Sequence, residues 1–147
     1  MPIRDATADD VPEILALVRE LAAYERLEDQ VVFDADEFAR HLFGPDPVAH
    51  VLLAVTIDGT VAGFALWFRS FSTFLGRPGI WLEDLFVRPE HRGSGLGREL
   101  LQTLFARTTG RVEWAVLDWN EPAQAFYRTL GAAQVDGWTT WRRAQPS

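Results

Sequence analysis

The sequence lacks cysteine altogether and contains only three histidines. Without cysteine, the chain cannot form disulfides, thiolate nucleophiles, iron–sulfur clusters or thiolate zinc sites. The histidines, His41, His50 and His91, show no i, i+4 spacing that would place two imidazoles on one face of a helix. We therefore expect no metal cofactor.

Long hydrophobic runs and excess positive charge are also missing. No stretch approaches about 18 consecutive apolar residues, and the N-terminus lacks the apolar block of a secretory signal. With 14 Lys and Arg against 21 Asp and Glu, the net charge is −7, which opposes binding to nucleic acid or to anionic membranes. We expect a cytoplasmic protein with neither as a partner. The acidic surface either attracts cationic ligands or only maintains solubility, and charge alone does not separate the two.

Internal repeats, low-complexity segments and Pro/Gly/Ser-rich linkers are absent, so residues 1–147 are expected to form one domain. Hydrophobic periodicity and turn residues predict strands alternating with helices. The expected strands are residues 3–4, 50–57, 61–68, 80–87, 111–117 and 135–141. The expected helices follow Thr7 and Asp34 as caps, then the glycine-rich segment, and last run over 123–130. The pattern predicts an α/β fold with a mixed, mostly antiparallel central sheet flanked by helices.

A glycine-rich segment follows the strand predicted over 80–87 and opens a helix. It reads Arg92, Gly93, Ser94, Gly95, Leu96 and Gly97. Backbone N–H groups at such a helix start point toward an anion, for example a pyrophosphate. A dinucleotide motif, G-x-G-x-x-G, needs glycine where Arg98 stands, and no Gly-Lys-Ser/Thr follows as a P-loop requires, so neither nucleotide motif fits. The alternative is glycines that only start a helix, although three in so short a span weaken the helix.

Two adjacent carboxylates, Glu83 and Asp84, lie inside the strand predicted over 80–87. Neighbouring residues of a strand point to opposite faces, so at least one carboxylate is expected to face buried or cleft territory. Such a group binds a cation or accepts a proton. The alternative is an edge strand with one solvated acid and one ion-paired acid.

The last predicted helix is capped by Asn120 and carries Tyr127. A tyrosine in this position is either a packing residue with a hydrogen-bonded hydroxyl or a functional phenol.

Taken together and in this order, these segments resemble the GNAT superfamily of N-acetyltransferases. The superfamily motif Arg/Gln-x-x-Gly-x-Gly/Ala is matched by Arg92, Gly95 and Gly97. More narrowly, the chain resembles the diamine (polyamine) and thialysine N-acetyltransferases. The matching segments are residues 20–25 (ELAAYE), 82–84 (LED), 91–95 (HRGSG), 117–122 (LDWNEP), 126–127 (FY) and 130–132 (LGA).

The resemblance implies that acetyl-CoA is the cosubstrate. In the family, the glycine turn holds the pyrophosphate, the pantetheine arm lies along one strand, and a later turn contacts the cofactor. The positions that match these elements are Arg92, Gly93, Ser94, Gly95, Leu96, Gly97 and Arg98; Leu85, Phe86 and Val87; and Asn120, Glu121, Pro122, Ala123 and Tyr127.

The resemblance also implies catalytic roles and a substrate class. Tyr127 matches the family's general acid toward the CoA thiolate, and Glu83 matches a carboxylate that accepts the amine proton through water. Tyr24, Glu25 and Asp84 match residues that, together with Glu83, line the site of a small cationic amine. Because relatives are dimeric and the aromatic C-terminal segment is apolar, a homodimer is expected.

The identity of the amine stays open between the polyamine and thialysine branches. Two other readings also remain. One is a GNAT enzyme that acetylates a protein or peptide amine. The other is a non-catalytic module that binds acetyl-CoA.

Overall fold

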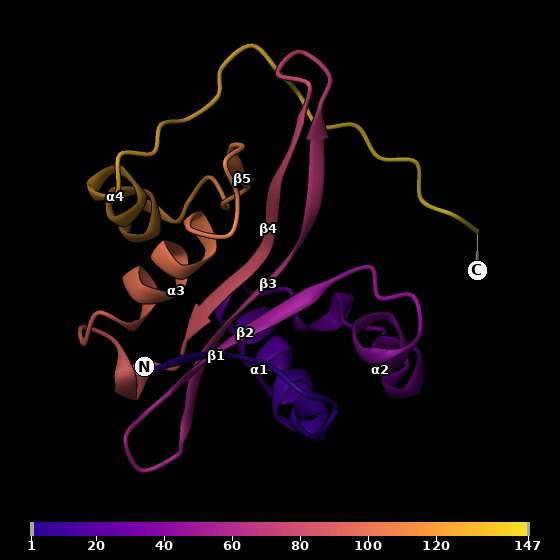
Figure 1. The fold of residues 1–147 in the computed structure, drawn as a ribbon, viewed down its shortest axis with the longest axis vertical. Helices are drawn as coiled ribbons and strands as arrows, with labels where there is room; N and C mark the ends of the chain where they lie inside the picture. The colour runs from indigo at the N-terminus through magenta and orange to yellow at the C-terminus, as the bar shows by residue number, and fades with distance from the viewer. Residues whose placement is uncertain (1, 147) are drawn as a thin grey trace. The chain divides into compact units, whose positions relative to one another are not determined.

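A computed structural model describes residues 2–146, which divide into two compact units after Ala115. The first unit holds a five-stranded sheet in the order β1-β2-β3-β4-β5 (Figure 1). Its strands are β1 (Ile3–Asp5), β2 (His50–Val55), β3 (Val61–Ser72), β4 (Arg77–Val87) and β5 (Val112–Trp114). The first four pair antiparallel, and β5 pairs parallel to β4. The predicted α/β class with a mostly antiparallel sheet is confirmed.

The helices are α1 (Val11–Tyr24), α2 (Ala35–Phe43), α3 (Leu96–Phe105) and, in the second unit, α4 (Glu121–Thr129). Short 3₁₀ turns occur at Ala8–Asp10, Glu28–Gln30 and Pro89–His91. Two caps predicted from the sequence form. The Asp34 carboxylate accepts a bond from the backbone N–H of Glu37 at 2.9 Å, and the Asn120 side chain accepts one from Ala123. No helix within residues 2–146 is both long and apolar enough to span a bilayer.

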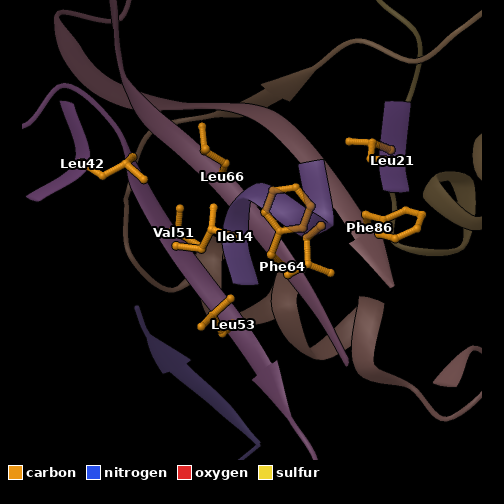
Figure 2. Packing of buried hydrophobic residues seen from close by; sticks show 9 residues of the cluster. Ile14, Leu21, Leu42, Val51, Leu53, Phe64, Leu66 and Phe86 are labelled. Carbon is orange, nitrogen blue, oxygen red and sulfur yellow. The ribbon is translucent and has the colours of Figure 1, made fainter. Parts of the chain in front are cut away.

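Helices α1 and α2 cover one face of the sheet, where a cluster of buried hydrophobic residues lies (Figure 2). Residues that face each other across a β-pair share a face, so the pairs Leu53–Phe64 and Phe64–Phe86 mark this side. The cluster consists of Ile14, Leu17, Leu21, Leu42, Val51, Leu53, Phe64, Leu66 and Phe86. Helix α3 contributes the buried Leu100, Leu101 and Leu104 and contacts β2, β3 and β4.

A β-bulge interrupts β4 at Glu83. Leu66 of β3 pairs with Asp84, but the next residue, Trp67, pairs with Leu82, so Glu83 is one residue more than the ladder needs. The inserted residue changes which face the following side chains take. Leu82, opposite Trp67, lies on one face, and Asp84, opposite Leu66, lies on the face that α1 covers.

Arg88, just after β4, ties the end of this strand to α1. Its guanidinium donates to Glu13 at 2.6 Å, to Glu20 at 2.8 Å and to the carbonyl of Val61 at 2.9 Å. The Arg88 side chain is only 17% exposed, so these charge-assisted bonds are partly shielded from solvent. They hold the last residues of β4 against the helix.

The strand predicted over 135–141 does not form, and this prediction was wrong. Gly137 has a φ of +89°, which breaks an extended run, and Val135, Trp138 and Trp141 are exposed in the single chain. A strand needs a neighbour to pair with, and no strand in residues 2–146 pairs with this segment. The strand predicted over 111–117 is also shorter than expected, whereas β3 and β4 extend further into their shared hairpin.

Candidate functional site

The α1 face of β4 carries an acidic group of three carboxylates. Asp84 reaches this face because of the bulge, and Glu25 is the C-cap residue that follows α1. Glu83 accepts a hydrogen bond from the indole N–H of Trp81 at 3.0 Å. Trp81 pairs with Phe68, two residues from Leu66 on the same face of β3, so Glu83 turns toward this side as well. Simple alternation of adjacent residues therefore does not hold at the bulge, but the expectation that at least one of the two carboxylates lies in buried territory is met by Asp84.

Asp84 has the most perturbed carboxyl group of the site. Burial raises its pKa from 3.8 to about 7, and repulsion from Glu83 and Glu25 adds to the increase. Among residues 2–146, no side chain or backbone group forms a hydrogen bond or ion pair with the Asp84 carboxylate. Burial also raises the pKa of Glu25. A positive ligand group beside Asp84 would relieve both the burial cost and the repulsion.

Arg92 and two aromatic rings lie at the end of the same face. The Arg92 guanidinium carbon lies 4.9 Å from the centroid of the Tyr24 ring and 5.4 Å from that of Phe86. The two rings are tilted, with centroids 6.4 Å apart. Arg92 Nε donates to the carbonyl oxygen of Val87 at 2.8 Å. Tyr24, predicted to line the amine site, is thus in contact with a residue predicted to bind the cofactor.

One edge of β4 lacks a strand partner past the bulge. β5 pairs only with Ile80, Trp81 and Leu82, and no other strand in residues 2–146 pairs on that side. The N–H of Arg88 donates to Ala62, which makes Gly63–Val87 a non-hydrogen-bonded pair of the β3–β4 ladder. By alternation Leu85 is in such a pair too, so the N–H and C=O groups of Leu85 and Val87 point away from β3.

This edge is suited to an extended ligand that adds main-chain hydrogen bonds, as a further strand does. That residues 85–87 lie along a pantetheine arm stays a prediction; of these residues, Phe86 bonds to β3 and buries its ring. The Val87 carbonyl is engaged by Arg92.

The glycine turn leads from β4 into α3. Gly93 and Gly95 have φ values of +82° and +89°, and Gly95 is the N-cap of α3. A side chain at either position would be strained although no atom lies within 4 Å of the added Cβ. Ser94 Oγ donates to the His91 carbonyl at 2.6 Å. The turn therefore presents the N-terminus of α3 without side chains in front of it, an arrangement that binds phosphate oxygens.

The remaining predicted residues, Asn120 to Ala123 and Tyr127, belong to the second unit. Asn120 is 5% exposed and caps α4, and Pro122 lies in the first turn. Tyr127 lies on α4 with its ring centroid 5.7 Å from that of Phe126. The first unit brings together the predicted residues of the acidic face, the β4 edge and the glycine turn.

Sequence reasoning missed the indole of Trp81 as a partner of Glu83 and the special position of Asp84. Both follow from the bulge, for which the run Leu82-Glu83-Asp84-Leu85 gives no local signal. No group of three His, Asp or Glu side chains in residues 2–146 is arranged to hold a metal ion.

A family model described as "Acetyltransferase (GNAT) family" matches residues 14–132. Thialysine N-epsilon-acetyltransferase of Bos taurus is 36% identical over 154 residues, which cover 95% of this chain and 90% of that protein. L-ornithine N5-acetyltransferase of Arabidopsis thaliana is 30% identical, with 95% of this chain and 82% of the relative covered. An integron cassette protein from the mobile metagenome of V. cholerae has the same fold, with a TM-score of 0.79, 24% identity and coverage of 99% and 94%.

Replacing Asp84 by Asn should remove a pH-dependent loss of stability. Because the folded pKa of about 7 exceeds the ordinary aspartate value of 3.8, the native state binds the extra proton, and stability falls as pH rises from about 4 to about 7. The loss amounts to at most about 4 kcal/mol, at 1.36 kcal/mol per unit. Urea unfolding should therefore show Asp84→Asn as stable as the wild type at pH 4 and more stable at pH 8.

The control is Asp136→Asn, which removes an exposed carboxylate and should leave the difference between the two pH values as in the wild type. If wild type and Asp84→Asn lose the same free energy of unfolding between pH 4 and pH 8, Asp84 does not have the raised pKa.

Proposed function

The chain belongs to the GNAT acetyltransferase family, and on that premise we propose that it transfers the acetyl group of acetyl-CoA to a primary amine of a small cationic substrate. The substrate class is a diamine or polyamine, or an amino acid of the thialysine type. The observation that carries the amine assignment is the Asp84 carboxylate, which has no partner in residues 2–146 and lies beside Glu25 and Glu83.

The names of the relatives support a small amine as the substrate class, but they do not identify one amine. Thialysine and ornithine, named for two relatives, each carry a side-chain ammonium that would complement the carboxylates of Asp84, Glu25 and Glu83. A relative in Homo sapiens is named for spermidine and spermine. The carboxylates of this site would also repel an acidic protein surface, which disfavours such a surface as the partner. A peptide or protein amine, or binding without catalysis, is the alternative.

The chemistry requires the amine to lose a proton before it attacks. An amine with a pKa of about 10.4 gives up this proton at pH 7 at a cost of about 4.6 kcal/mol. Carboxylates that bind the ammonium increase the cost because they raise its pKa. We assign binding to the partly buried Asp84 and Glu25, and proton acceptance, through water, to Glu83, which is exposed and so in contact with solvent.

The nitrogen lone pair then attacks the thioester carbon, and the carbon–sulfur bond breaks as the tetrahedral intermediate collapses. Backbone N–H groups on the open edge of β4, at Leu85 and Val87, are suited to stabilise the oxyanion. Tyr127 is proposed to donate a hydrogen bond, or its proton, to the departing thiolate. Since a phenol of pKa about 10 is a weaker acid than a thiol of about 8.5, a hydrogen bond to the sulfur suffices for this role.

In this proposal acetyl-CoA is held by the glycine turn, residues 92–98, by the edge of β4 at 85–87 and by residues 120–123. We also propose a cytoplasmic homodimer, supported by the exposed apolar side chains Val135, Trp138 and Trp141. A monomer mass in sedimentation at micromolar concentration would contradict the dimer.

The direct test is a steady-state screen with acetyl-CoA against spermidine, thialysine, ornithine, lysine, aminoglycosides and lysine-containing peptides. We expect release of CoA with at least one small cationic amine and a kcat/KM well above that for the peptides. Efficient turnover of peptides alone, or none with any amine, contradicts the proposal.

Gly95→Asp should raise the KM for acetyl-CoA by about tenfold or more and change the amine KM little. The new side chain is strained at φ +89° and puts a negative charge in front of the α3 N-terminus. Gly76→Asp is a matched control, because Gly76 also has a positive φ and open space but lies in the β3–β4 hairpin turn. Equal effects of the two substitutions would remove the turn from cofactor binding.

Tyr127→Phe should lower kcat by about 10²- to 10⁴-fold and leave both Michaelis constants nearly unchanged, because charge on sulfur develops only in the transition state. If Tyr127 only packs, the variant instead loses about 1 kcal/mol of stability and keeps its kcat. Measuring kcat and the thermal midpoint on one preparation separates the two outcomes. A folded variant that retains more than about half of kcat rules out the role.

A further inference from the structure

Arg92 makes contacts in the first unit that a residue serving only as a phosphate ligand does not need. Its guanidinium covers the rings of Tyr24 and Phe86, and its Nε–H is used on the Val87 carbonyl. Three parts of the chain meet at this side chain: the end of α1, the end of β4 and the start of the glycine turn.

The contact with Arg92 bears on the orientation of the Tyr24 ring. Tyr24 is the last residue of α1 and is 39% exposed, and its ring contacts both the Arg92 guanidinium and the Phe86 ring. The guanidinium of arginine is planar, so it can stack on an aromatic face while its N–H groups donate hydrogen bonds to neighbouring acceptors. The ammonium of lysine is not planar and cannot stack in this way. The Arg92 guanidinium thus contacts the Tyr24 ring and the neighbouring Phe86 ring at once.

We propose that Arg92 is a positioning residue for the amine substrate, which sets the Tyr24 ring at the amine site and links it to the cofactor edge of β4. The proposal rests on the proposed function only for the identity of the amine site. The bond from Nε to Val87 leaves the two terminal nitrogens of Arg92 for a phosphate, so positioning and cofactor binding are compatible.

The contacts of Arg92 with the Tyr24 ring and the Val87 carbonyl give a reason for arginine rather than lysine at this position. If Arg92 served the cofactor only as a positive charge, lysine would replace it. If it orients Tyr24, lysine keeps the charge but loses the planar stack and the Nε bond. The two roles therefore separate in the Michaelis constants of one variant.

The kinetic experiment compares Arg92→Lys and Arg92→Gln with the wild type, using acetyl-CoA and the best amine. A stacked cation on an exposed ring corresponds to an effect of about two- to fivefold. We expect Arg92→Lys to raise the amine KM by about this factor and to change the acetyl-CoA KM by less than about twofold. Arg40→Gln, which removes one exposed charge on α2, controls for net charge and should leave both constants unchanged.

The second experiment needs no activity. The chain has only two tyrosines, Tyr24 and Tyr127, so ring-labelled tyrosine gives two sets of NMR signals, assigned with Tyr24→Phe. In Arg92→Lys and Arg92→Gln the Tyr24 signals should shift, whereas in Arg40→Gln they should stay in place.

An unshifted Tyr24 signal in a folded Arg92 variant, or an amine KM restored to the wild-type value by lysine, overturns the proposal. If no amine is turned over, the proposed function fails, and the NMR comparison alone still decides whether Arg92 orients Tyr24.

Discussion

One extra residue in β4, Glu83, determines how the candidate site in the first unit is arranged. Because Glu83 is inserted between the pairs Leu66–Asp84 and Trp67–Leu82, Asp84 moves to the face covered by α1 and joins Glu25. The parallel partner β5 ends at this level, pairing no further than Leu82. The bulge therefore separates a half of β4 that pairs with β5 from a half whose outer edge has no strand partner. The acidic Asp84 and the unpaired backbone groups of Leu85 thus lie on consecutive residues.

The sequence predicted most elements of the fold, because their signals are local. Periodic apolar residues marked the helices, and the caps at Asp34 and Asn120 formed as expected. The strand predicted over 135–141 failed for a non-local reason. Its residues are apolar, but strand formation depends on a neighbour's backbone, and in residues 2–146 no strand supplies one.

The site was predictable where it depends on residue type in a fixed local order, as in the glycine turn, and the family resemblance given by Arg92, Gly95 and Gly97 is confirmed. The site was not predictable where its geometry depends on the register between β3 and β4. Simple alternation sends Glu83 and Asp84 to opposite faces, whereas the register brings both to one and makes Asp84 the group with the raised pKa. The stack of Arg92 on Tyr24 joins residues 68 positions apart in the sequence, which no local pattern contains.

We propose that the bulge leaves the edge of β4 open for CoA, and amide hydrogen exchange measured by NMR tests this proposal. The N–H groups of Leu85 and Val87 point away from β3, whereas that of Phe86 bonds to Phe64. In the protein alone, Leu85 and Val87 should exchange fast and Phe86 slowly, and saturating CoA should slow the first two. Leu85 and Val87 amides that are already protected without CoA, or whose exchange CoA leaves unchanged, would contradict the account.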